Sequence, residues 1–241
     1  MFIGHFAVGF AAKKVAPQIS LGTLFLAALL LDCVWPFLVL AGVERVEIAP
    51  GDTTFTPLAF VHYPVSHSLL MAVVWGLLLA GLYWRARRDG NGAIWIGLAV
   101  VSHWMLDALT HRPDLPLYPG GAQLVGAGLW NSIPGTVAVE GLMFAAALAL
   151  YLNCTRSVDR IGKYALWGLV VALLLAYGSA IFGAPPPSAQ AVAIADIAGG
   201  GLFVAWGYWI DRHREAVSRY RRPHEPPQEL NAQRHSSRLA R

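Results

Sequence analysis

One apolar stretch, Ser102–His111, carries three ionisable side chains at a regular spacing. His103, Asp107 and His111 are four residues apart, so on an α-helix each lies about 40° round from the last and all three share nearly one face. Ionisable groups on an apolar helix are costly inside a membrane and usually mark a functional site. Imidazole and carboxylate groups together suit Zn²⁺, Mn²⁺ or Fe²⁺, and such a metal turns a bound water into a hydroxide nucleophile.

Further candidate ligands come from other segments of the chain. His62 and His67 are five residues apart and would point about 140° apart on one helix. Pro64 suits the first position of a helix, and the residue before a proline is held extended. We therefore expect His62 to be a loop residue that folds back over the end of a helix carrying His67. The predicted metal ligands are His5, Asp32, His62, His67, His103 and Asp107.

Two more groups are candidate catalytic residues. Glu140 could act as a general base, and His111 and Glu140 could instead orient the ligands from outside the metal's own shell or contact substrate. Each ligand also has a structural interpretation: His103 with Asp107 could be a hydrogen-bonded pair between helices, and Asp32 a protonated packing residue or part of a proton relay. Asp196 could serve either the site or a helix–helix hydrogen bond.

The composition sets the environment of these groups. Of the 241 residues, 56% are hydrophobic and 13% are charged, whereas a soluble domain carries about 25% charged residues. We therefore expect an all-α, polytopic membrane helix bundle in contact with the lipid bilayer. The net charge of +4 is accounted for by the segment 211–241, which holds eight Arg and four acidic residues. Beside a membrane domain this charge indicates a cytoplasmic tail attracted to anionic lipid, and no nucleic-acid partner is expected.

The apolar runs predict one short helix and six spans. Residues 2–12 are too short to cross a bilayer, so we expect a half-membrane or interfacial helix closed by Lys13 and Lys14. The polar segment 43–61 is expected to form a loop with a short strand pair. The membrane domain is predicted to cover 1–210, and 211–241 to form a basic tail that is disordered at its end. The six spans are expected at about 19–42, 64–84, 93–111, 134–153, 164–183 and 190–210.

The basic residues predict the orientation and the depth of the site. With six spans and both termini cytoplasmic, eight of the ten Lys and Arg residues before 211 fall on the inner side, as the positive-inside rule requires. His5 is eight residues from Lys13, or about 12 Å along a helix, which places it near the bilayer centre with Asp32. Five His and four carboxylates then share one layer between the midplane and the outer surface, while the inner half of every span has none.

Several of these elements resemble a known family. His62-Tyr63-Pro64-Val65-Ser66-His67-Ser68 resembles its H-x-x-x-x-H-S element, and Ser102–Thr110 resembles its S-H-x-x-x-D-x-x-T element. With His5 and Asp32 at matching places, residues 1–115 resemble the bacterial membrane-bound metal-dependent hydrolases, which are distantly similar to zinc-dependent phospholipases C. The family usually has Arg-Gly where this chain has Tyr63 and Pro64. The resemblance implies a divalent-metal site, with Zn²⁺ preferred over Mn²⁺ or Fe²⁺, in a bacterial inner membrane.

The preferred hypothesis is a metal-dependent hydrolase acting in the outer half of the membrane. A site at that depth suits a lipid or another amphiphilic ester or phosphoester. One alternative is a transporter or channel for metal ions or protons, in which the same ligands bind an ion in transit. The other is a non-catalytic membrane protein with a structural metal, which would lack an open coordination position.

Overall fold

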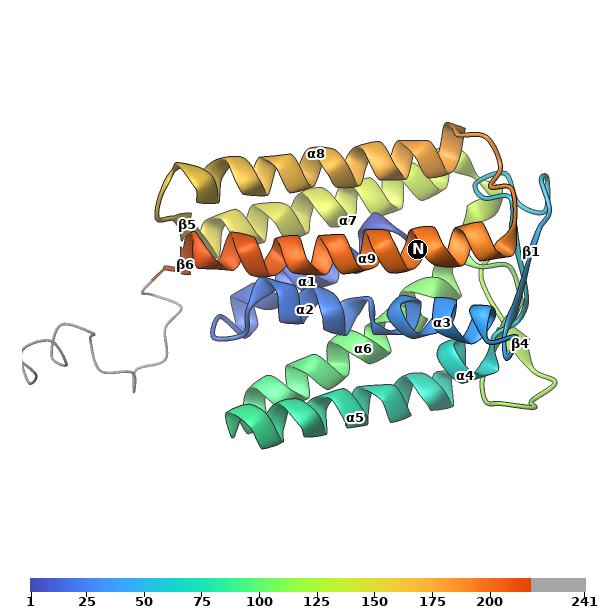
Figure 1. Ribbon diagram of the computed structural model, residues 1–241, viewed down its shortest axis with the longest axis horizontal. Helices are drawn as coiled ribbons and strands as arrows, with labels where there is room; N and C mark the ends of the chain where they lie inside the picture. The colour runs from blue at the N-terminus through green and yellow to red at the C-terminus, as the bar shows by residue number, and fades with distance from the viewer. Residues whose placement is uncertain (218–241) are drawn as a thin grey trace, which may run out of the picture.

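The computed structural model describes residues 1–217 as an all-α membrane bundle with three small strand pairs. Figure 1 shows the long helices lying side by side, with short strands at both ends of the bundle. Each strand pair is antiparallel: β1 with β2, β3 with β4, and β5 with β6. The helices are α1 Ile3–Val15, α2 Leu21–Ala28, α3 Leu30–Leu40, α4 Pro64–His67, α5 Leu69–Arg87, α6 Gly90–Thr110, α7 Ile133–Cys154, α8 Arg160–Phe182 and α9 Ala189–Arg212, and the 3₁₀ helix η1 is Leu129–Asn131. The strands are β1 Arg45–Ile48, β2 Leu58–His62, β3 Leu115–Pro116, β4 Leu124–Val125, β5 Thr155–Ser157 and β6 Arg214–Ala216.

The number of spans agrees with the prediction, but two of them are interrupted. Five described helices are long and apolar enough to cross a membrane, and α2 with α3 makes a sixth if the bent pair is one span. The predicted span 19–42 is broken at Leu29, where the axes of α2 and α3 differ by 55°. The predicted helix from Pro64 is also divided, because Ser68 is extended and its Oγ accepts the Met71 N–H to start α5 anew. Both interruptions lie beside the predicted ligands.

The short helix α1 is a half-span held inside the bundle. Its 13 residues extend about 20 Å, and Figure 1 marks the N-terminus between the two ends of the bundle. Phe6 and Phe10 are buried and pack edge-on against Phe25 of α2. At the other end of α1, the buried Lys13 donates to Asp211 at 2.9 Å. This packing fixes the depth of His5.

Close packing of α2 on α9 depends on two glycines. Gly22 lies against the ring of Tyr208, and a side chain at Gly207 would collide with the backbone of Gly22. Small residues allow helix axes to approach in membranes, where packing and not hydrophobicity drives association. The contact therefore holds α9 beside the broken α2–α3 pair.

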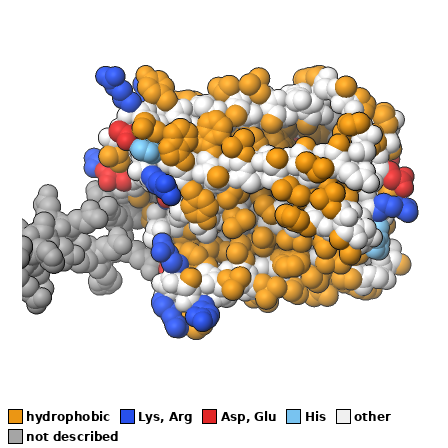
Figure 2. Space-filling model, in the orientation of Figure 1, with side chains coloured by type: hydrophobic (Ala, Val, Ile, Leu, Met, Phe, Trp, Pro, Cys, Tyr) orange, Lys and Arg blue, Asp and Glu red, His pale blue; other side chains and the backbone are white. Residues whose placement is uncertain are grey.

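The surface of the bundle is divided by charge. In Figure 2 apolar side chains cover the flank of the bundle, and Lys and Arg side chains gather at the end where β5 and β6 lie. The start of the predicted tail is ordered, because α9 continues to Arg212 and β6 pairs with β5. The remainder of that prediction, residues 218–241, falls outside the described part of the chain.

Candidate metal centre

The site begins with two residues one turn apart on α6. His103 and Asp107 are 0% and 2% exposed, and the His103 Nε2 lies 3.1 Å from the Asp107 Oδ2. The other ring nitrogen, Nδ1, is 2.8 Å from the carbonyl oxygen of Ala28, to which it donates. The last carbonyls of a helix have no partner within it, so the break after α2 supplies this acceptor. Nε2 is buried without a hydrogen bond among the described residues.

His67 approaches the same point from α4. Its Nε2 lies 3.3 Å from Oδ1 of Asp32 and 3.8 Å from Oδ2 of Asp107. Its Nδ1 is 2.7 Å from Oγ of Ser66, which again leaves Nε2 facing the carboxylates. Two imidazoles on different helices thus present the same ring nitrogen to one place.

Asp32 closes the group from the first turn of α3, where the helix dipole favours a carboxylate. Its Oδ1 lies 3.4 Å from Nε2 of His103. Its side chain is 34% exposed, whereas His67, His103 and Asp107 are at most 5% exposed. The group is therefore buried on most sides and accessible at Asp32.

Asp32, His67 and His103 offer ligand atoms that all lie within 4.8 Å of one another, and Asp107 approaches both histidines. The nitrogen–oxygen distances around the group are 3.1, 3.3, 3.4 and 3.8 Å. Four ligands about 2.0–2.1 Å from a tetrahedral Zn²⁺ are separated from one another by about 3.3 Å. Four facing acceptors repel one another unless a cation lies between them. Nε2 of His103 has no hydrogen-bond partner among the described residues, so it is available to such a cation.

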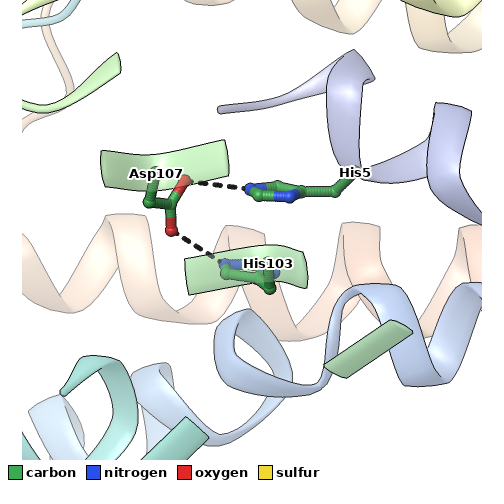
Figure 3. A group of neighbouring side chains, drawn as sticks. All are labelled: His5, His103 and Asp107. Atoms are coloured by element: carbon green, nitrogen blue, oxygen red, sulfur yellow. Dashed lines mark hydrogen bonds and ion pairs between the residues drawn. The ribbon is translucent and has the colours of Figure 1, made fainter. Parts of the chain in front are cut away.

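His5 lies against this group but contacts a different oxygen. Its ring stacks on that of His103, with centroids 3.6 Å apart and planes 5° apart, as Figure 3 shows. Its Nε2 lies 3.1 Å from Oδ1 of Asp107, and the amino group of Met1 lies 2.5 Å from the same oxygen. Potential ligand atoms of His5, His103 and Asp107 all lie within 4.8 Å of one another. Asp107 therefore connects two neighbouring sets of groups, and His5 belongs to the second.

Glu140 is placed at the start of α1. Its Oε2 accepts the N–H groups of Phe2 and Gly4 at 2.9 and 3.0 Å, and no side chain of α1 caps that end. The Glu140 carboxylate, on α7, therefore holds the start of α1, the helix that carries His5. The other oxygen, Oε1, is buried with no hydrogen-bond partner in the described chain, and its predicted catalytic role stays a prediction.

The structure keeps His62 and His111 apart from the four-atom group. His62 ends β2, is exposed, and lines a cavity of about 620 Å³ at the end of the bundle that carries β1–β4. His62 is therefore the last residue of a strand and not a loop residue folded over α4, the helix that carries His67. His111 follows the last residue of α6 with an extended backbone, so the common face ends at Asp107.

His111 belongs to a separate buried cluster. Its Nδ1 lies 3.0 Å from Oδ1 of Asp114, and its ring packs against Trp130 at 4.2 Å. Burial lowers the pKa of His111, so its ring is neutral at pH 7 and donates through Nδ1. Tyr63 donates to the same Asp114 oxygen at 2.6 Å, and burial together with Asp114 raises its pKa. Tyr63 lines the cavity on one side and packs on His67 on the other.

Two contributors were missed at the level of sequence. Ser66 and Glu44 are 0% and 3% exposed and are bonded to each other and, through Ser66, to His67. Ser66 directly precedes the predicted ligand His67 in the sequence, and this position could have indicated its role. Glu44 lies in a polar loop 23 positions earlier, and nothing local marks it as buried.

The site falls within a region that matches one described family. A model of the family described as YdjM inner membrane protein matches residues 1–184, which include all the ligand candidates. No curated protein and no solved structure matches the chain.

Proposed function

The chain belongs to the YdjM inner membrane protein family, and we propose that it is a membrane-embedded metal-dependent hydrolase. The observation that carries the proposal is the set of two imidazole nitrogens and two carboxylate oxygens whose nitrogen–oxygen pairs lie 3.1–3.8 Å apart. Neutral imidazole and carboxylate ligands suit Zn²⁺, with Mn²⁺ and Fe²⁺ as alternatives. Asp32, His67, His103 and Asp107 would hold the ion.

Other residues of the chain would orient the ligands, accept a proton or contact the substrate. When bound, the metal supplies Lewis-acid activation of water and of a carbonyl or phosphoryl oxygen. His5 contacts Oδ1 of Asp107 and so helps to orient Oδ2, the oxygen that faces His67 and His103. Glu140 has a free Oε1 that can take up a proton. His111 lies next to Tyr63, whose ring packs on His67, and is proposed to contact substrate there.

Access to the site supports a lipid-like substrate. Asp32 is the exposed ligand, and its helix packs on α9. Asp196 of α9 is half-buried and within electrostatic range of Asp32 and His103. Figure 2 shows a hollow between α8 and α9, in the half of the bundle that ends in β1 and β4. An ester or phosphoester carried by an amphiphile could reach Asp32 from within the bilayer.

We propose that this hollow lies in the outer leaflet. Lys and Arg gather at the end that carries β5 and β6, and positively charged ends face the cytoplasm. We propose that the end of the bundle carrying β5 and β6, where α1 ends at Lys13 and Lys14, faces the cytoplasm and that hydrolysis takes place in the outer half of the bilayer. The expectation of a cytoplasmic N-terminus is corrected, because the amino group of Met1 is buried against Asp107. The polar layer then lies away from the cytoplasmic surface.

A direct test is hydrolysis by purified protein reconstituted in lipid nanodiscs. Fluorogenic acyl esters and phosphodiesters with lipid tails would be compared with their water-soluble counterparts, with and without Zn²⁺. We expect Zn²⁺-dependent turnover of a lipid-tailed substrate that Asp32→Asn abolishes and Asp159→Asn leaves intact. Absence of turnover, with Zn²⁺ flux into liposomes that Asp32→Asn removes, would contradict hydrolysis and support transport.

A further inference from the structure

A buried carboxylate lies behind His67 at the start of α4. Glu44 accepts the N–H groups of Val65 and Ser66 on Oε1, each at 2.8 Å, and the hydroxyl of Ser66 on Oε2 at 2.6 Å. Tyr63, at the N-cap position of α4, provides no side-chain cap. Glu44 therefore binds the first turn of α4 from the loop before β1, although it is distant in sequence.

The direction of these hydrogen bonds is fixed by chemistry. An ionised carboxylate only accepts, so the Ser66 hydroxyl must donate its single proton to Glu44. Oγ of Ser66 is then left only with lone pairs toward Nδ1 of His67, 2.7 Å away. His67 must donate through Nδ1, and in the neutral ring Nε2 then carries the lone pair.

A neighbouring serine provides a contrast. Ser68 also adjoins His67 and is also 0% exposed. Its Oγ accepts the Met71 N–H and starts α5. It forms no described hydrogen bond with His67. Burial beside His67 therefore does not by itself determine which ring nitrogen carries the proton.

We propose that Glu44 and Ser66 are positioning residues that lock His67 in the Nδ1–H tautomer, so that Nε2 is held ready to bind the metal. This inference rests on the proposed function only in taking His67 as a ligand. Acceptors that orient a metal-binding imidazole commonly change metal affinity 10–100-fold when removed. Through Glu44, the loop outside the membrane helps to set a ligand inside the bundle.

Glu44→Gln is the most informative variant, because it keeps the shape of the side chain and reverses the hydrogen bonds. The new amide group donates to Oγ of Ser66, which frees the hydroxyl to donate to Nδ1 of His67. The ring must then carry its proton on Nε2. Ser66→Ala removes the acceptor, and Ser66→Thr retains it.

The tautomer is read by ¹⁵N NMR of the full chain labelled at histidine, without added metal, with the His67 signals assigned by comparison with His67→Gln. We expect Nδ1–H in the wild type, in Ser66→Thr and in Ser68→Ala, and Nε2–H in Glu44→Gln. An Nε2–H ring in the wild type, or the same tautomer in the wild type and Glu44→Gln, would overturn the inference.

Zn²⁺ affinity gives the second readout, by competition with a chelating indicator. We expect about 10–100-fold weaker binding for Ser66→Ala and Glu44→Gln, recovery in Ser66→Thr, and no comparable loss in Ser68→Ala. Equal losses in Ser66→Ala and Ser68→Ala would overturn the inference. A wild type that binds no Zn²⁺ but shows the Nδ1–H tautomer, reversed in Glu44→Gln, would contradict the proposed function and leave only the control of the His67 tautomer by Glu44 and Ser66 standing.

Discussion

Nε2 of His103 lies 3.1 Å from Oδ2 of Asp107, one turn along α6, and has no hydrogen-bond partner among the described residues. The other ring nitrogen of His103, Nδ1, donates to the carbonyl oxygen of Ala28. A buried nitrogen that faces carboxylates without bonding to them is costly unless a cation lies between. We therefore propose that the pair are two ligands of one metal ion.

Removing the metal should destabilise the protein. A ligand that binds only the folded state stabilises it by about 2.7 kcal/mol at 100 times its Kd. We expect 1,10-phenanthroline to lower the thermal unfolding temperature and Zn²⁺, but not Mg²⁺, to restore it. The same treatment should leave the unfolding temperature of His103→Ala unchanged, and a matching shift in that variant would show that the chelator acts elsewhere.

Substitutions at Glu140 should separate its capping role from its proposed catalytic role. Glu140→Ala leaves the N–H groups of Phe2 and Gly4 without their acceptor, at a cost of about 1–3 kcal/mol. Glu140→Gln keeps an acceptor oxygen, so the free energy of unfolding should change less. If Gln at this position retains both stability and hydrolysis, Glu140 is a cap and not a base.

The contact between α2 and α9 predicts opposite effects for two glycines on one helix. A Cβ at Gly207 would lie 3.0 Å from backbone atoms of Gly22, whereas a Cβ at Gly200 would meet nothing within 4 Å. We expect Gly207→Ala to destabilise by about 1–3 kcal/mol and Gly200→Ala to be neutral or slightly stabilising. Thermal unfolding in detergent measures both, and equal effects would contradict the packing.

The orientation can be tested by labelling single cysteines in whole cells, after replacing Cys33 and Cys154 by serine. Gly120 lines the cavity at one end of the bundle, and Gly90 begins α6 at the other. A membrane-impermeant maleimide applied outside should label Gly120→Cys in intact spheroplasts and Gly90→Cys only after lysis. The reverse pattern would place the site in the cytoplasmic half.

Sequence patterns predicted the elements and the layer in which the ligands meet. The lengths of the apolar runs predicted the spans. The four-residue spacing placed His103 and Asp107 on one helix face, and the distance from Lys13 predicted that His5 lies at a similar depth. These are local properties, so they can be read without the fold. The charge asymmetry in Figure 2 likewise follows from loop composition.

The parts that sequence reasoning missed depend on departures from regular helix. The break at Leu29 frees the Ala28 carbonyl for His103, and the restart at Ser68 separates His67 from α5. Glu44 is buried by contacts across 21 and 22 positions. Helical periodicity in a sequence does not reveal such breaks or long-range contacts. It also wrongly predicted that the helix face shared by His103 and Asp107 continues to His111, which lies beyond the end of α6.

The central claim is that the group formed by Asp32, His67, His103 and Asp107 binds one metal ion. The most direct measurement is the metal content of purified protein by mass spectrometry, compared with His103→Ala, Asp107→Ala and the control His213→Ala, whose histidine pairs with Asp159 at the opposite end of the bundle. We predict about one Zn²⁺ per chain in the wild type and control and a loss of at least tenfold in the two site variants. Metal-free wild type after growth and Zn²⁺ reloading, or equal metal in all four proteins, would contradict it.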